Sequence, residues 1–122
     1  MPTPYRERIL DHYQHPRHRG RLNNPERMGE AENPVCGDWV RVELRLNGNG
    51  TVAEATFEGE GCVIAMAAAS MLMEHIQRRP AEELRHLGEA DIFQLLGMDV
   101  RPARRACALV SLQALQEALK AI

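Results

Sequence analysis

Hydrophobic and polar residues alternate strictly in the middle of the chain. From residue 40 to residue 46, valine and leucine occupy the even positions, while arginine and glutamate occupy the odd ones. This alternation is typical of a half-buried strand. Residues 47–50 read Asn-Gly-Asn-Gly, and residues 51–58 resume with small and β-branched side chains. Because asparagine and glycine tolerate the positive φ of a tight turn, the two segments predict a β-hairpin that ends at Gly59.

The flanking segments show helical patterns. Tyr5, Ile9 and Tyr13 recur at four-residue spacing and predict a short N-terminal helix. Residues 62–79 are rich in alanine, methionine and leucine without an internal glycine or proline, and they predict a largely buried helix. Shorter helices are expected at 81–87 and 90–96, and Pro102 is expected to open a last helix. Residues 16–34, rich in glycine, asparagine, proline and charge, predict a long loop.

Strands followed by a run of helices predict an α+β fold, in which a small antiparallel sheet packs against helices as a two-layer sandwich. At 122 residues the chain is expected to form a single domain covering residues 1–122. Hydrophobic residues make up 44% of the sequence and charged residues 26%, which is the composition of an ordinary globular protein.

The charge balance excludes some classes of partner. A net charge of -2 argues against nucleic acid as the main partner, because phosphate binding needs an excess of lysine and arginine. The N-terminus has no pattern of a secretory signal, and the most apolar window, residues 62–73, is too short to cross a bilayer. We therefore expect a cytoplasmic protein without a membrane partner. Residues 17–21 and 101–105 are locally basic, and the second stretch lies beside a cysteine.

Three cysteines carry the candidate chemistry. They cannot all pair within one chain, and cytosolic thiols stay reduced, so metal binding or reactivity is favoured over a disulfide framework. Gly37 permits a tight turn in which Cys36 and Asp38 both face one ion. Cys62 and Cys107 are predicted near the starts of two helices, where the helix dipole lowers the pKa of a thiol.

Three thiolates and one carboxylate would complete a tetrahedral zinc-type ligand set. The cysteines, however, are 26 and 45 positions apart, unlike the close pairs of zinc ribbons. From spacing alone, the alternative that they are small buried hydrophobic residues stays open.

Ordered motifs add a family resemblance. The segments in question are residues 5–17, residues 33–38, residues 59–65 with the later Ala69 and Ser70, and residues 102–109. They resemble the motifs of the IscU/SufU family, also called the NifU N-terminal domain family, and the third cysteine motif is SufU-like. The motifs occur in the family's order and cover nearly the whole chain.

The resemblance implies a role in iron-sulfur cluster assembly with a set of assigned residues. By this resemblance the ligands of Zn²⁺, or of iron in a nascent [2Fe-2S] cluster, are Cys36, Asp38, Cys62 and Cys107. One of the three cysteines would accept persulfide sulfur from a cysteine desulfurase of the SufS or IscS type, and a downstream acceptor would receive the cluster or the sulfur. Arg104, three positions before the third cysteine, matches an arginine that helps dock the desulfurase. The protein would act as a scaffold or as a zinc-dependent sulfurtransferase, two roles that stay open here.

The chain departs from both branches of the family. Ala106 replaces the histidine that precedes the third cysteine in IscU proteins, and residues 100–104 lack the Leu-Pro-Pro-Val-Lys segment that a dedicated Hsp70 chaperone recognises. SufU-like proteins lack both features but usually carry an extra segment between the second and third cysteines, which is missing here. A rival of a different class is a non-catalytic domain stabilised by structural zinc. Closed structural sites prefer four thiolate or imidazole ligands, whereas a carboxylate suits exchange.

Overall fold

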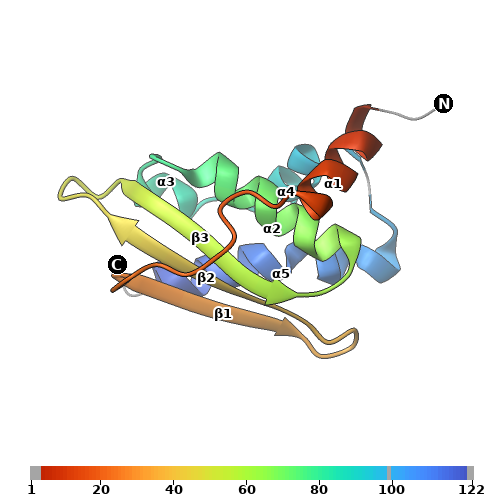
Figure 1. Ribbon diagram of the computed structural model, residues 1–122, viewed down its shortest axis with the longest axis horizontal. Coiled ribbons are helices and arrows are strands. Elements are labelled where there is room, and N and C mark those ends of the chain that lie inside the picture. The colour runs from red at the N-terminus through yellow and green to blue at the C-terminus, as the bar shows by residue number, and fades with distance from the viewer. Residues whose placement is uncertain (1–3, 99, 121–122) are drawn as a thin grey trace.

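Three strands and five helices make up the described part of the chain. The computed structural model describes residues 4–98 and 100–120. In chain order the elements are α1 (Pro4–Gln14), β1 (Arg27–Asn33), β2 (Asp38–Leu46), β3 (Val52–Glu60), α2 (Val63–Ile76), α3 (Ala81–Leu84), α4 (Glu89–Leu96) and α5 (Pro102–Leu119). The strands form one antiparallel sheet in the order β1-β2-β3, against which the helices pack (Figure 1). The predicted α+β class is confirmed.

The core lies between the sheet and two long helices. Val40, Val42 and Leu44 are fully buried, as the alternation in β2 predicts. α5 packs across β1 and β2, and α2 packs on β3 (Figure 1). Residues 65–73 of α2 are all buried, so the prediction of a largely buried helix is confirmed. α2 and α5 are therefore held against the sheet, and the candidate ligands lie at one end of that sheet.

Helix boundaries follow local chemistry. α5 begins at Pro102 as predicted, because the fixed φ of proline suits the first helical position. α2 ends at Ile76, three residues earlier than predicted, and Arg78 adopts a φ of +65° just beyond it. α4 ends at Leu96, and Gly97, with a φ of +75°, caps the helix. Among the helices of residues 4–98 and 100–120, none is both long and apolar enough to cross a membrane.

The prediction of a loop over the whole of residues 16–34 is wrong in its second half. Residues 27–33 form β1, which pairs with β2 from Arg27 opposite Leu44 to Asn33 opposite Asp38. The strand lacks an apolar alternation because its inward face consists of glycine, alanine and asparagine. A methyl group added at Gly29 would lie 2.2 Å from the backbone oxygen of Ala114, so close packing of α5 replaces side-chain burial here. Hydrophobic periodicity cannot detect such a strand.

Gly59 does not end the hairpin, contrary to the prediction. β3 continues to Glu60, and Gly59 pairs with Val40 inside the sheet. A Cβ atom at this position would lie 2.3 Å from the backbone oxygen of Trp39. The glycine therefore permits a close backbone approach within the strand. Because β3 continues to Glu60, Gly61 and Cys62 follow directly at this end of the sheet.

α1 is attached to α2 by a buried polar contact. The Nδ1 atom of His12 lies 2.7 Å from the hydroxyl oxygen of Ser70, which also accepts a hydrogen bond from the backbone N–H of Arg17. Burial, assisted by the positive charge of Arg17, lowers the pKa of His12 and favours its neutral form. Of the three residues whose spacing predicts α1, Ile9 is buried and Tyr13 is 42% exposed, while the side chain of Tyr5 lies outside the described residues.

Candidate metal centre

The turn between β1 and β2 places two candidate ligands at one end of the sheet. Cys36 is exposed in this turn, and Asp38 is the first residue of β2. Gly37 between them has a φ of +79°, a conformation that glycine adopts without steric cost. Its backbone N–H donates to the backbone oxygen of Asn33 at 2.7 Å, which closes the turn. The sequence-based expectation that Gly37 turns the backbone here is confirmed.

Cys107 joins these two residues from the opposite layer. It lies on α5 and is fully buried, and the side-chain amide of Asn33 donates to its sulfur at 3.6 Å. The ligand atoms of Cys36, Asp38 and Cys107 all lie within 4.8 Å of one another. Three of the four predicted ligands, which are 71 positions apart at the extremes, therefore meet at one place.

The fourth predicted ligand lies beside this group. Cys62 is half-buried and caps the N-terminus of α2, and its backbone N–H donates to the Oδ1 atom of Asp38 at 3.3 Å. Its thiol lies close to the thiol of Cys107 and to the guanidinium of Arg104. Among the described residues, its sulfur does not join the group of three that lies within 4.8 Å. Cys62 thus lies at the rim of the site, between the ligand cluster and Arg104.

The pKa of the Cys107 thiol is shifted in the direction opposite to the prediction. Burial, followed by hydrogen bonds to Asp38 and Cys36, raises the pKa of its thiol to about 12. The expected lowering by the helix dipole is wrong for this residue, because Cys107 lies in the second turn of α5 and the dipole effect is confined to the first. Desolvation and neighbouring acceptors dominate instead. A bound cation reverses this balance, since a coordinating thiol loses its proton.

The residues present fit a metal ion. Asp38 is 3% exposed, and its Oδ2 atom is buried without a hydrogen-bond partner among the described residues. An unpartnered buried carboxylate oxygen is costly unless a cation or a donor satisfies it. Beside it lie thiols, the ligands that zinc and iron-sulfur clusters favour. The two sulfurs and one oxygen gathered here, with the thiol of Cys62 beside them, are donors that suit Zn²⁺.

Arg104 is placed directly at the cluster. Its side chain is exposed, and a hydrogen bond to Cys62, together with the nearby thiols of Cys107 and Cys36, raises the pKa of its guanidinium. A permanent positive charge thus faces the three cysteines from the start of α5. The sequence gives Arg104 a role only by resemblance, whereas its contact with Cys62 is a feature of the folded chain.

Two residues of the site have no role in the sequence-based prediction. Asn33 hydrogen-bonds the sulfur of Cys107, and Gly61 lets the chain pass Asp38, since a Cβ atom at Gly61 would lie 2.8 Å from the carboxylate. Gly61 directly precedes Cys62, and Asn33 stands three positions before Cys36. The signal that could have identified both residues is their position within the segments 33–38 and 59–65, which carry the family resemblance.

Comparison with known proteins identifies relatives of this chain. Residues 4–122 match the model of the NifU-like N-terminal domain. The zinc-dependent sulfurtransferase SufU of Bacillus subtilis is 36% identical, over 96% of this chain and 90% of the relative. The iron-sulfur cluster assembly scaffold protein IscU of Aquifex aeolicus is 33% identical, over 98% of this chain and 76% of the relative.

Solved structures give the same result at the level of the fold. A SUF-system iron-sulfur cluster assembly scaffold protein from Fervidobacterium islandicum superposes with a TM-score of 0.76 at 25% identity, over 93% of this chain and 95% of that one. A NifU-like N-terminal domain from Brucella abortus has the same fold, with a TM-score of 0.77 at 21% identity and a coverage of 95% of this chain and 92% of that one. With the family model matched over nearly all of its length, the chain belongs to the NifU-like N-terminal domain family, the family of the SufU and IscU iron-sulfur cluster assembly proteins.

Proposed function

We propose that this protein serves iron-sulfur cluster assembly by receiving sulfur from a cysteine desulfurase at a metal site formed by Cys36, Asp38, Cys62 and Cys107. The observation that carries the proposal is the convergence of the Cys36, Asp38 and Cys107 ligand atoms within 4.8 Å. The unpartnered oxygen of Asp38 adds support, because a cation would satisfy it. Zn²⁺ bound by these residues would keep the thiols deprotonated and hold the site together.

Accessibility favours Cys36 as the sulfur acceptor. Cys36 is exposed, whereas Cys62 is half-buried and Cys107 is buried. In the transfer, the Cys36 thiolate attacks the outer sulfur of the donor's persulfide. A new sulfur–sulfur bond forms on Cys36, the donor's sulfur–sulfur bond breaks, and the donor leaves as a thiolate, so no external oxidant or reductant is needed. Cys62 and Cys107 then act mainly as ligands.

The position of Arg104 supports a role in the same step. Its guanidinium contacts Cys62 and lies near the other two thiols. A persulfide or thiolate arriving at the site is anionic, and a fixed cation there favours its approach. We propose that Arg104 assists docking of the desulfurase at this point.

Sulfur transfer can be tested directly with the purified, metal-analysed protein. We expect a cysteine desulfurase and cysteine to add one sulfur atom to Cys36, detectable by mass spectrometry of the peptide that contains it. Cys36→Ser should lower sulfur transfer by about a hundredfold or more, because the nucleophile is removed. Val35→Ser, at the 89% exposed neighbouring position, should leave transfer unchanged.

The outcome also separates the two possible roles. If anaerobic addition of ferrous iron produces cluster absorbance on the protein, the cluster is its cargo and the protein is a scaffold. If zinc is retained while the desulfurase turns over faster, the protein is a sulfurtransferase. Absence of both responses would contradict the proposed function.

Asp38→Ala distinguishes exchange from a purely structural zinc site. A carboxylate is the poorest match to soft iron-sulfide chemistry and is the ligand that a cluster most easily gives up. We therefore expect Asp38→Ala to fold normally and to hold an assembled cluster longer than the wild-type protein does. The lifetime is measured from the decay of cluster absorbance. Unfolding of the variant would instead favour the structural-zinc rival.

A further inference from the structure

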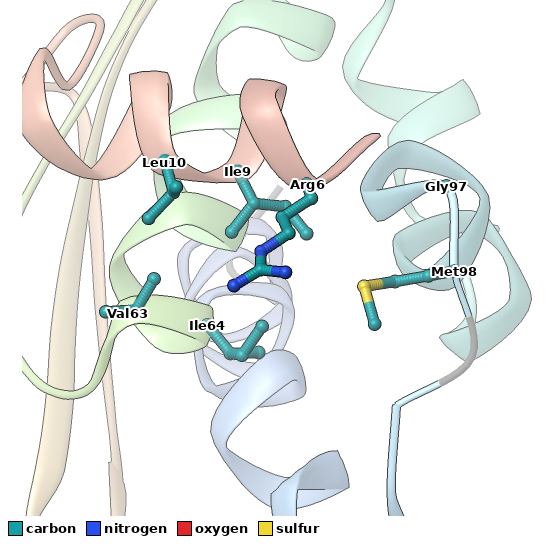
Figure 2. A pocket seen from close by; sticks show the side chains of 7 residues that line it. All are labelled: Arg6, Ile9, Leu10, Val63, Ile64, Gly97 and Met98. Carbon is teal, nitrogen blue, oxygen red and sulfur yellow. The ribbon is translucent and has the colours of Figure 1, made fainter. Parts of the chain in front are cut away.

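An apolar groove lies beside the candidate metal centre, between α1, the first turn of α2 and the end of α4. Its volume is about 510 Å³, within the range of small-molecule and side-chain pockets. Figure 2 shows side chains from all three segments facing one open space. They are Arg6, Ile9, Leu10, Val63, Ile64 and Met98, with Gly97 at the end of α4.

Two side chains at the mouth of this groove are unusually exposed for their type. Leu10 on α1 is 42% exposed, and Met98 after α4 is 45% exposed. They face the groove from opposite sides (Figure 2). The left-handed cap at Gly97 ends α4 and turns the chain so that Met98 stands on the rim. Clustered exposed apolar side chains mark surfaces that bind another molecule.

The groove begins one residue beyond a candidate ligand. Val63, which lines it, directly follows Cys62, and the thiol of Cys62 contacts Arg104. A protein that reaches the cysteines from this side therefore covers the groove as well. The groove and the thiol of Cys62 thus lie at the same end of α2.

The rim near the metal centre is basic. Arg101, Arg104 and Arg105 are exposed at the start of α5, and the first turn of this helix contains no acidic residue. The guanidinium carbon of Arg105 lies 5.4 Å from the ring centre of Phe93, which holds this charge beside α4. The side chain of Arg6 also lines the groove (Figure 2). The chain as a whole has a net charge of -2, so these arginines form a local positive patch that attracts an acidic partner to this side of the molecule.

We propose that the groove docks an acidic segment with apolar anchor side chains that belongs to the protein donating the sulfur. The proposal rests on the proposed function. The apolar anchors cover Leu10, Ile64 and Met98, and the acidic side chains face the arginines at the start of α5. A donor's persulfide is itself anionic, so charge complementarity favours the donor's approach along this rim. The groove determines affinity for the donor, while the cysteines perform the chemistry.

The test measures stimulation of a purified cysteine desulfurase from the same organism as a function of the concentration of this protein, in its metal-loaded form. Leu10→Glu and Met98→Glu should each raise the KM for this protein by about tenfold or more, with kcat and metal content unchanged. Tyr13→Glu on α1, which is equally exposed, and Met28→Glu on β1, which is 52% exposed, lie outside the groove and should leave KM unchanged. Arg101→Ala should raise KM roughly threefold and weaken its dependence on salt.

The outcomes separate the docking proposal from the function on which it rests. If the wild-type protein neither accepts sulfur nor stimulates the desulfurase, the proposed function fails, and the docking proposal fails with it. If the wild-type protein is active but the groove variants behave like the two controls, only the docking proposal is overturned. Equal weakening of groove and control variants, or a loss of kcat at constant KM, also overturns it. Circular dichroism of each variant confirms that the fold is retained.

Discussion

Cys107→Ala is expected to lower the affinity for zinc by about a hundredfold or more and to abolish cluster retention. Substituting a residue that only supports a metal ligand already costs about ten- to a hundredfold, so loss of a ligand should cost more. The ligand atom of Cys107 also lies within 4.8 Å of those of Cys36 and Asp38, which places it inside the site. Competition with a chromophoric chelator measures the change.

The fold should survive this substitution. Removing one buried sulfur atom costs about 1 kcal/mol in the free energy of unfolding. Ala106→Ser, at the exposed preceding position on the same helix, is the control and should bind zinc like the wild-type protein. Wild-type zinc affinity in Cys107→Ala would mean that this cysteine is a small core residue and that the ion binds elsewhere.

Elements with a strong period could be predicted from the sequence. The alternation of residues 40–46 identified β2, and the proline at position 102 identified the start of α5. β1 could not be predicted, because its inward side chains are too small to produce a hydrophobic period. Its existence depends on α5, which covers it and lies far away in the sequence.

Some features of the candidate site could likewise be predicted from the sequence, and others could not. The four candidate ligands were assigned by resemblance, and spacing alone left them open. The turn at Gly37 followed from local chemistry and is confirmed. The pKa of Cys107 was predicted in the wrong direction, because burial is a tertiary property and outweighs the dipole of its own helix. The contact between Arg104 and Cys62 likewise arises only when α5 packs beside the start of α2.

The apolar groove has no signal in the sequence. Its walls come from three segments, and neither Leu10 nor Met98 departs from what a helix or a helix end normally contains. Only their shared exposure around one space makes them notable. A local sequence pattern cannot report such an arrangement, because it depends on where α1 and α4 settle against α2.

Gly29→Ala is expected to lower the free energy of unfolding by about 3 kcal/mol and to weaken zinc binding at the same time. The new methyl group would lie 2.2 Å from the backbone oxygen of Ala114 and 2.3 Å from the backbone nitrogen of Ala118. Both atoms belong to the main chain of α5, so no side-chain rotation can relieve the overlap. α5 must move away from β1, and Cys107 moves with it, away from the turn that holds Cys36.

Urea denaturation and zinc competition measure the two effects of this substitution on one protein. Gly48→Ala is the matched control, because Gly48 lies in the exposed turn after β2 and a methyl group there meets no atom within 4 Å. Its effect on the free energy of unfolding should stay within about 0.5 kcal/mol. A parallel loss of stability and zinc affinity in Gly29→Ala alone would establish that the close contact between β1 and α5 positions the metal centre. Unchanged stability would mean that α5 lies farther from β1, and the convergence of Cys107 with Cys36 and Asp38 would then lose its structural basis.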